Sequence, residues 1–216
     1  MIVSPGRAYV FVHIPKTGGT AMALALEARA MKDDILIGDT PKARRRRHRI
    51  DAAQARGRVW KHATLADIDG LFTTDEIGRL FAFTLVRNPW DRLVSYYHWL
   101  RAQRFDHPAV ATAKAKDFNG FLQDAAIQTA LAAHPANRYM TRADGVEQAQ
   151  AYIRLEHLAE DAEPLFAHLG FRFDLPRANA SARARDWRPF YTDNTADIVA
   201  RVCAADIARF GYRFDG

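Results

Sequence analysis

Residues Val10–Met22 read VFVHIPKTGGTAM. The stretch Arg7–Ile14 is rich in Val, Ile, Tyr and Phe and predicts a buried strand, whereas Thr20–Lys32 has no Gly or Pro and predicts a helix. Between them lies the turn Pro15–Thr20, PKTGGT, with Lys16 inside it. Proteins use a strand, a glycine-containing turn and a helix start to hold a phosphate on backbone N–H groups. The stretch therefore predicts an anion-binding turn at the end of a strand.

A second junction of the same kind follows. Phe81–Val86, FAFTLV, predicts a buried strand, and the helix after it is expected from Pro89 to about Arg101, with Asn88 as its N-cap. Further short strands are expected at Arg58–His62 and Ala151–Leu155, and Gly38–Ile50 is expected to be a loop. Strands that alternate with helices predict an α/β fold with a central parallel sheet flanked by helices. Both junctions would then open at one edge of that sheet.

The composition is that of a globular protein. The 216 residues are 49% hydrophobic and 26% charged, and we expect a single domain over residues 1–216. The one cysteine, Cys203, cannot form an internal disulfide, and the histidines show no metal-ligand spacing, so no metal is expected. The N-terminus has no apolar run, and no stretch has the length of a membrane span. We expect a cytoplasmic protein.

Positive charge is concentrated in one segment. The net charge is +6, and Lys42–Lys61 holds nine Lys or Arg residues, including the Arg44–Arg47 run, with Asp51 as its single acid. One interpretation is a solvated loop, and the other is a surface for an anionic substrate, cofactor or membrane. The sequence favours the first slightly.

The PKTGGT turn does not match the Walker A pattern, because its lysine precedes the glycines. Gly18 and Gly19 still allow the backbone to approach a phosphate closely, and Thr17 and Thr20 add hydroxyl groups. Lys16 adds a full charge. By itself this turn is as compatible with a tight structural connection as with a binding site.

The two junctions together carry a family resemblance. HIPKTGGT after one strand, and FTLVRNPWDRLVSYYHWL at the end of another, resemble the two cofactor motifs of sulfotransferases that use 3′-phosphoadenosine 5′-phosphosulfate (PAPS), especially the carbohydrate-type sulfotransferase family 2. Weaker similarity covers Lys61-His62, Arg154–Leu158, the stretch from Leu175 to Ser181 and Ile207–Tyr212. The resemblance implies a P-loop NTPase-like sulfotransferase fold.

The resemblance also implies roles for particular residues. Pro15, Lys16, Thr17, Gly18, Gly19 and Thr20 would hold the 5′-phosphosulfate, with Lys16 at the sulfuryl group or its bridging oxygen. Arg87 and Ser95 would hold the 3′-phosphate; Ser95 lies about two helical turns beyond Arg87, so both can face one anion. His62 is the favoured catalytic base, and His13 is expected to position the loop. The product would be adenosine 3′,5′-bisphosphate, and no metal is implied.

The expected partner is a hydroxyl-bearing acceptor, namely a carbohydrate or other glycan-like substrate. Arg44–Arg49, Arg183, Arg185 and Arg188 would suit an anionic saccharide, and the oligomeric state is open. Two other functions remain possible at this stage. One is a P-loop-like kinase or nucleotide phosphotransferase, which the missing Gly-Lys-Ser/Thr disfavours. The other is a non-catalytic polyanion-binding protein that uses the arginine run, although no aromatic-interleaved basic motif supports specific nucleic-acid binding.

Overall fold

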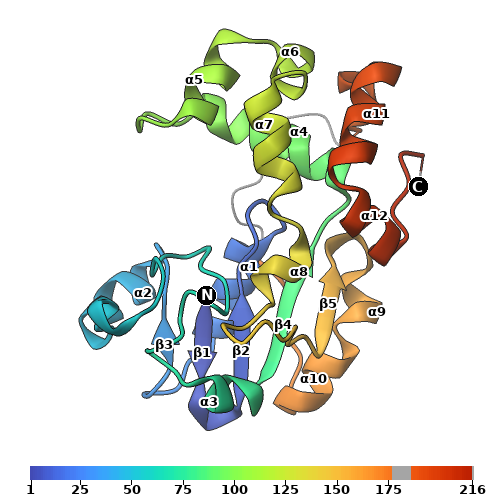
Figure 1. The fold of residues 1–216 in the computed structure, drawn as a ribbon. Helices are drawn as coiled ribbons and strands as arrows, with labels where there is room; N and C mark the ends of the chain where they lie inside the picture. Colours follow the sequence, from blue (N-terminus) through green and yellow to red (C-terminus); the bar gives the residue numbers. More distant parts are fainter. Residues whose placement is uncertain (177–185, 216) are drawn as a thin grey trace. The chain divides into compact units, whose positions relative to one another are not determined.

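The structure is a computed structural model that describes residues 1–176 and 186–215 (Figure 1). The described chain forms two compact units. Unit 1 consists of Met1–Val86 and Ala136–Asn179, and unit 2 consists of Arg87–Pro135 and Ala180–Gly216. The expectation of one domain over residues 1–216 stays a prediction, and each unit is described by itself.

Unit 1 is built on a five-stranded sheet in the order β3-β1-β2-β4-β5. Its strands are β1 (Ile2–Ser4), β2 (Tyr9–Val12), β3 (Ile35–Leu36), β4 (Phe81–Val86) and β5 (Ala151–Arg154). Strands β2, β4 and β5 are parallel, whereas β1 is antiparallel to both of its neighbours. The predicted α/β class with a helix-flanked sheet is thus confirmed, and the parallel part is its three-stranded side.

Alternate residues of the strands form one buried face. Phe11 lies opposite Phe83, and Phe83 lies opposite Ala151, so the period-2 pattern of each strand is in register with its neighbours. Helix α1 (Gly19–Ala28) packs Met22 and Leu26 into this face. In Figure 1 helix α1 lies behind the sheet and the short helix α8 (Ala136–Tyr139) in front of it.

The edge of the sheet beside β1 was not predicted. Strand β1 pairs Ile2 with Phe11 through a turn at Pro5–Arg7, and it is too short to show a sequence period. The predicted strand Arg58–His62 was wrong: the segment is a turn, in which the Ala63 amide donates to the Trp60 carbonyl oxygen at 3.0 Å. The edge position is occupied by β3 instead.

The predicted loop Gly38–Ile50 was also wrong, because it contains helix α2 (Pro41–Arg46). Thr40 is the N-cap and accepts a hydrogen bond from the Ala43 amide, and Pro41 occupies the first helical position. The basic residues fall in the last turn, where they face the negative end of the helix dipole.

The other helices of unit 1 are short. They are α3 (Thr74–Gly78), α9 (Leu158–Asp161) and α10 (Glu163–Leu169). Helix α3 has the capping box Thr73–Glu76, and Gly170 ends α10 with a φ of 72°. Short 3-10 turns lie at Pro5–Arg7, Arg47–Arg49, Ala52–Gln54 and Leu155–His157.

Unit 2 is helical. Helix α4 (Pro89–Arg101) has the predicted bounds and the predicted N-cap, Asn88, whose side chain accepts from the Trp90 amide at 3.1 Å. The other helices are α5 (Pro108–Ala115), α6 (Phe118–Leu122), α7 (Ala125–Ala132), α11 (Asp193–Val202) and α12 (Ala204–Phe210), with a 3-10 turn at Arg188–Phe190.

The core of unit 2 is aromatic. Trp90 stacks on Trp187 with ring centroids 6.4 Å apart, and Phe214 meets both rings edge-on. The indole N–H of Trp90 donates to the Ala196 carbonyl oxygen at 3.0 Å. Buried Trp90 and Tyr97 are therefore packing residues. No helix in the described part of the chain has the length and hydropathy to cross a membrane.

Candidate functional site

The PKTGGT turn has a backbone that departs from ordinary strand and helix values. Lys16 has a φ of 66°, a left-handed conformation that costs a non-glycine residue roughly 1–2 kcal/mol. Gly18 has a φ of 89° and is the N-cap of α1. Thr17 is buried, and its hydroxyl donates to the Ile14 carbonyl oxygen at 2.9 Å. The Thr17 hydroxyl thus bonds within the loop region. Its hydrogen, which was expected to bind a ligand, is donated to the protein backbone instead.

The two glycines of the turn are required by space. A Cβ atom on Gly19 would lie 2.0 Å from Cδ2 of His13, and one on Gly18 would lie 3.0 Å from a methyl carbon of Leu155. No side chain fits at Gly19 unless His13 moves. The loop backbone is therefore packed directly against the end of strand β2.

Backbone N–H groups at the start of α1 supply the positive part of the loop. The carbonyl oxygen of Gly18 accepts from the amides of Ala21 and Met22. Within residues 1–176 and 186–215, the structure shows no backbone acceptor for the amides of Gly18, Gly19 and Thr20. Such groups, with the positive end of the helix dipole behind them, favour a bound anion.

His62 lies at the base of this loop, although it is 49 residues away in sequence. Its Nδ1 is 2.7 Å from the His13 carbonyl oxygen. The two imidazole rings meet edge to face with centroids 4.6 Å apart. Because a carbonyl oxygen only accepts, this hydrogen bond places the His62 proton on Nδ1 and leaves Nε2 with a lone pair.

Both histidines are held neutral. The pKa of His62 is lowered to about 4, mainly by burial and in smaller part by the positive charge of Lys61, against the opposing effect of the hydrogen bond to His13. Burial, followed by the nearby His62, lowers the pKa of His13 well below its ordinary value. At neutral pH the Nε2 atom of His62 is therefore able to accept a proton.

The backbone around His62 is fixed by neighbours on both sides. The α-amino group of Met1 donates to the carbonyl oxygens of Lys61, at 3.0 Å, and Ile37, at 2.9 Å. The Lys61 ammonium pairs with Asp39 at 2.8 Å. The hydrogen bond to Lys61 is the main reason why the pKa of the Asp39 carboxyl group is lowered. These contacts explain how a turn outside the sheet holds a histidine in one place.

Arg87 and Ser95 lie in unit 2, where Arg87 immediately follows strand β4. Nε and Nη2 of Arg87 donate to Oδ2 of Asp91 at 2.8 and 2.6 Å, and both side chains are largely buried. Ser95 is buried in α4. Asp91 and Ser95 are four residues apart on one face of α4, and Arg87 lies four residues before Asp91, just ahead of the helix. Asp91 thereby orients the guanidinium that the sequence assigned to a phosphate.

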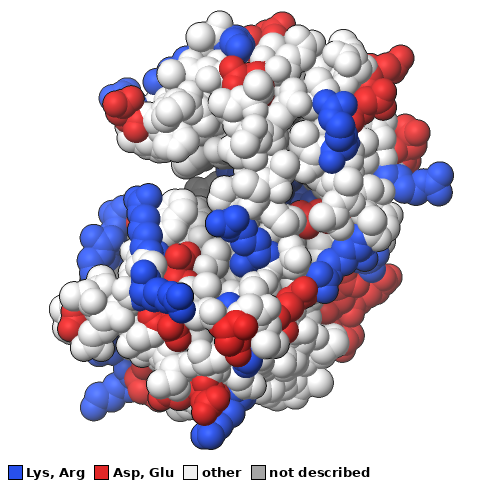
Figure 2. All heavy atoms as spheres, in the orientation of Figure 1, with Lys and Arg blue, Asp and Glu red and all other residues white. Residues whose placement is uncertain are grey.

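The basic segment divides into two groups of side chains. Lys42, Arg46 and Arg49 donate to the carbonyl oxygens of Glu27, Met31 and Lys32, which lie in the last turn of α1 and the residues after it. These three are structural. The other group leaves positive charge on the surface around α2, where Figure 2 shows blue side chains gathered. Of the arginines proposed for an acceptor, Arg183 and Arg185 lie outside the described residues.

Sequence reasoning found the loop but missed two features next to it. The contact between the His13 carbonyl and His62 joins distant residues, and no local pattern encodes it. The second feature is the exposed Trp60, whose ring centroid is 5.0 Å from that of His62. Its position two residues before a candidate base was the signal in the sequence that could have identified it. In the described residues, no group of three or more His, Cys, Asp or Glu side chains is arranged to hold a metal ion.

A family model described as the sulfotransferase family matches residues 1–201. No match was found among curated protein sequences. Among solved structures, mouse sulfotransferase SULT7A1 complexed with PAP is similar at 13% identity and a TM-score of 0.48, covering 93% of this chain and 84% of that one. The family match spans nearly the whole chain and agrees with the two motifs, and the chain therefore belongs to the sulfotransferase family.

Proposed function

We propose that this sulfotransferase moves a sulfuryl group from PAPS to a hydroxyl group of a carbohydrate or similar glycan. The observation that carries the proposal is the hydrogen bond from His62 to the His13 carbonyl, two residues before the PKTGGT loop. It ties a neutral histidine to the strand end from which the anion-binding loop begins. The proposed phosphate-binding loop and the proposed base are thus held by the same end of strand β2.

The loop fits the phosphosulfate end of PAPS. Gly18 and Gly19 leave the loop backbone without side chains, and the amides at the start of α1, which have no backbone acceptor among the described residues, can bind an anion. Thr20 adds a half-buried hydroxyl group. Lys16 supplies the full positive charge that a departing phosphate oxygen requires.

The proposed reaction is an in-line displacement at sulfur. The acceptor oxygen forms a new S–O bond while the S–O bond to the 5′-phosphate breaks. The proton of the acceptor hydroxyl passes to Nε2 of His62, and the electron pair of the broken bond stays on the phosphate, whose charge Lys16 stabilises. Arg87 and Ser95 are proposed to hold the 3′-phosphate, with Asp91 orienting Arg87.

The family assignment argues against the two other functions. A kinase would need a Walker-type lysine after the glycines, and here Lys16 precedes them. A polyanion-binding protein would present the basic segment Lys42–Lys61 to its ligand, yet two arginines of that segment, Arg46 and Arg49, donate to backbone carbonyls of the protein itself.

Nucleotide binding tests the proposed donor. At a hundredfold excess over the dissociation constant, adenosine 3′,5′-bisphosphate should stabilise the wild-type protein by about 2.7 kcal/mol, whereas ATP with Mg²⁺ should not. In a thermal-shift titration, Arg87→Ala should lose most of this shift, because the guanidinium assigned to the 3′-phosphate is gone. Arg101→Ala, at the far end of the same helix, is the matched control and should retain it. A shift with ATP and none with the bisphosphate would overturn the proposed function.

The pH dependence tests His62 as the base. Because burial sets the pKa of His62 at about 4, protonation at Nε2 should remove activity only as the pH falls through about 4. The ratio kcat/KM should therefore be insensitive to this group between pH 5 and 7, with the thermal midpoint recorded at each pH to confirm folding. An acid limb centred near 6.5, the ordinary histidine value, would contradict the assignment.

A further inference from the structure

A leucine that is distant in the sequence lies against the PKTGGT loop. Leu155 is the first residue after strand β5, and its two methyl carbons lie 3.0 and 3.4 Å from the place that a Cβ atom on Gly18 would occupy. The next nearest atom is a methyl carbon of Leu85 in β4, at 3.6 Å. Leu155 therefore packs on the backbone of the loop itself. The loop is bounded by His13 at Gly19 and by Leu155 at Gly18.

Gly18 is a position at which the loop needs an outside contact. Glycine adopts positive and negative φ about equally readily, so its own chemistry does not keep Gly18 at a φ of 89°. The amides of Gly18, Gly19 and Thr20 have no backbone acceptor in the described part of the chain, and the dihedral angles at these positions set their directions. A neighbour that holds Gly18 in one conformation therefore holds the anion-binding N–H groups in place, and groups that are already in place bind a ligand at a lower entropic cost.

A single carboxylate fixes the residue before Leu155. Oδ2 of Asp161 accepts from the backbone N–H of Arg154 at 2.9 Å and from its Nε at 2.7 Å, and Oδ1 accepts from Nη2 at 2.9 Å. The side-chain hydrogen bond from Arg154 is the main reason why the pKa of Asp161 is lowered, so the carboxylate is ionised at neutral pH. Only 15% of the Asp161 side chain is exposed. Asp161 thus holds both the backbone and the side chain of Arg154 at the end of β5.

This ion pair joins two elements that meet beside the loop. Strand β5 runs parallel to β4, with Arg154 opposite Val86, and helix α9 ends at Asp161. Figure 1 shows α9 beside β5. A pair that only joined β5 to α9 would contribute to stability alone. Because Leu155 follows Arg154 directly and touches Gly18, the pair also determines where the leucine meets the loop.

We propose that Leu155 is a positioning residue for the PKTGGT loop, and that Arg154 and Asp161 hold it in place. The inference rests on the proposed function, which assigns this loop to the 5′-end of PAPS, and it adds residues that act on cofactor affinity through the loop. The consequence is selective. Loss of the leucine weakens the binding of a 5′-phosphate and leaves the rest of the nucleotide bound as before.

Calorimetric titration with two nucleotides tests the role of Leu155. Adenosine 3′,5′-bisphosphate carries the 5′-phosphate, and adenosine 3′-monophosphate lacks it. The wild-type protein should bind the bisphosphate at least about tenfold more tightly than the monophosphate. Leu155→Ala, which gives Gly18 room to move, should weaken bisphosphate binding about tenfold and change monophosphate binding less than about twofold.

Two further substitutions at the same position make the test independent of one variant. Leu155→Met has nearly the volume of the wild-type side chain and should keep at least about a third of the affinity for the bisphosphate. Leu155→Val is a smaller truncation than Leu155→Ala, and it should give a smaller loss of the same selective kind if Leu155→Ala does not fold. The thermal midpoint of each variant confirms folding.

Asp161→Asn tests the ion pair. The substitution keeps the shape of the side chain and removes its charge, so it should weaken bisphosphate binding about threefold and leave monophosphate binding unchanged. Glu163→Gln is the matched control, because Glu163 forms an exposed ion pair with Arg172. It should bind both nucleotides as the wild-type protein does.

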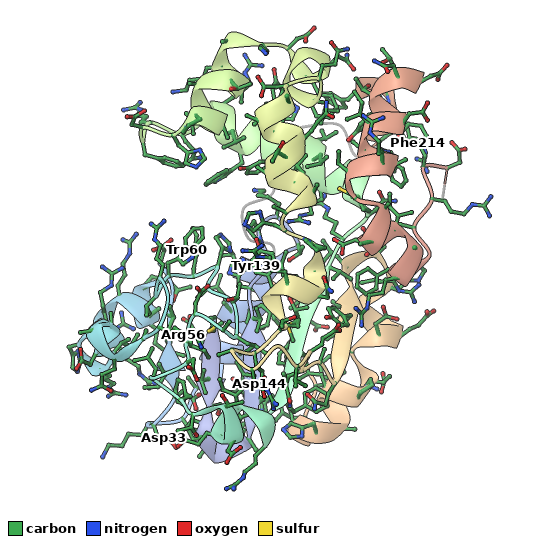
Figure 3. The ribbon with its side chains drawn as sticks, in the orientation of Figure 1. Asp33, Arg56, Trp60, Tyr139, Asp144 and Phe214 are labelled. Carbon is green, nitrogen blue, oxygen red and sulfur yellow. The ribbon has the colours of Figure 1, made fainter. Side chains whose placement is uncertain are left out.

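The two ends of the sheet in unit 1 provide a control for the loss of a leucine. In Figure 3 Trp60 lies at the end where the candidate base is found, and Asp33 lies at the other end. Leu169 belongs to this other end, because Nε2 of the adjacent His168 is 2.8 Å from the carbonyl oxygen of Arg7, which precedes β2. It is also partly buried and packs against the core. Leu169→Ala should lower the thermal midpoint but keep the wild-type preference for the bisphosphate.

The outcomes separate this inference from the proposed function. An unchanged preference for the bisphosphate in the leucine variants, or equal weakening of both nucleotides, would overturn the positioning role of Leu155. An unchanged preference in Asp161→Asn would overturn the role of the ion pair. Failure of the proposed function would be seen in the wild-type protein instead, either as no binding of the bisphosphate or as equal affinity for the two nucleotides.

Discussion

Replacing Lys16 by alanine should lower kcat by about 10²–10³-fold, the usual cost of removing a group that stabilises developing charge in the transition state. The expected loss follows from the position of Lys16 in the loop between β2 and α1. It is the cation of the loop, and its φ of 66° is unfavourable for any residue except glycine. A loop that required only shape would be expected to have a glycine there. Steady-state kinetics with saturating PAPS and the best acceptor measure the effect.

A second substitution at the same position separates charge from backbone strain. Lys16→Gly relieves the left-handed conformation and should raise the thermal midpoint relative to Lys16→Ala. Both variants should nevertheless lose activity to the same extent, because both lack the ammonium group. If Lys16→Gly kept wild-type kcat, the proposed charge-stabilising role of Lys16 would be wrong.

Replacing Gly19 by alanine should abolish binding of adenosine 3′,5′-bisphosphate and destabilise the protein by about 1–3 kcal/mol, the common cost of overpacking. The new Cβ atom would lie 2.0 Å from Cδ2 of His13. His13 is buried, its ring packs against Phe11 and His62, and it has little room to move. The loop must therefore shift. Calorimetric titration with the bisphosphate and chemical denaturation measure the two effects.

The double variant His13→Ala/Gly19→Ala tests the cause of that loss. Removing the imidazole ring makes room for the new methyl group, so the double variant should be more stable than the two single effects predict when added. Gly38→Ala is the control, because its Cβ would meet only Ala43, at 3.8 Å, and it should be nearly neutral. Additive destabilisation in the double variant would show that the contact with His13 is not the reason for the glycine.

The parts of the fold with strong local signals could be predicted from the sequence. FAFTLV is a continuous apolar run, and Asn88-Pro89 combines an N-cap with a first-turn proline, so β4 and α4 have the predicted bounds. The Thr73–Glu76 capping box similarly marks the start of α3. In each case interactions between residues that are close in the sequence decide the local structure.

The errors lie where tertiary contacts override local preference. Four consecutive arginines repel one another and favour a loop, yet α2 forms because Thr40 and Pro41 begin it and because Lys42 and Arg46 donate to carbonyl oxygens in the last turn of α1 and just after it. Strand β1 has three residues and depends on β2 for its pairing. Arg58–His62 has a strand-like composition, but β3 takes the edge of the sheet.

The candidate site shows the same division. The PKTGGT loop is contiguous, so its residues could be named from the sequence alone. That Asp91 is the carboxylate partner of Arg87 could also be inferred from their four-residue spacing. The tautomer of His62 could not, because it depends on the carbonyl oxygen of His13, a residue 49 positions away in the sequence.

Sulfuryl transfer itself is the most direct test of this account. Wild-type protein is incubated with ³⁵S-labelled PAPS and either a hyaluronan hexasaccharide or maltohexaose, and in parallel with γ-³²P-labelled ATP, Mg²⁺ and the same saccharides. The account predicts ³⁵S on a saccharide, and a rate reduced at least 10²-fold in His62→Ala. Transfer of ³²P without transfer of ³⁵S, or undiminished ³⁵S transfer in His62→Ala, would contradict it.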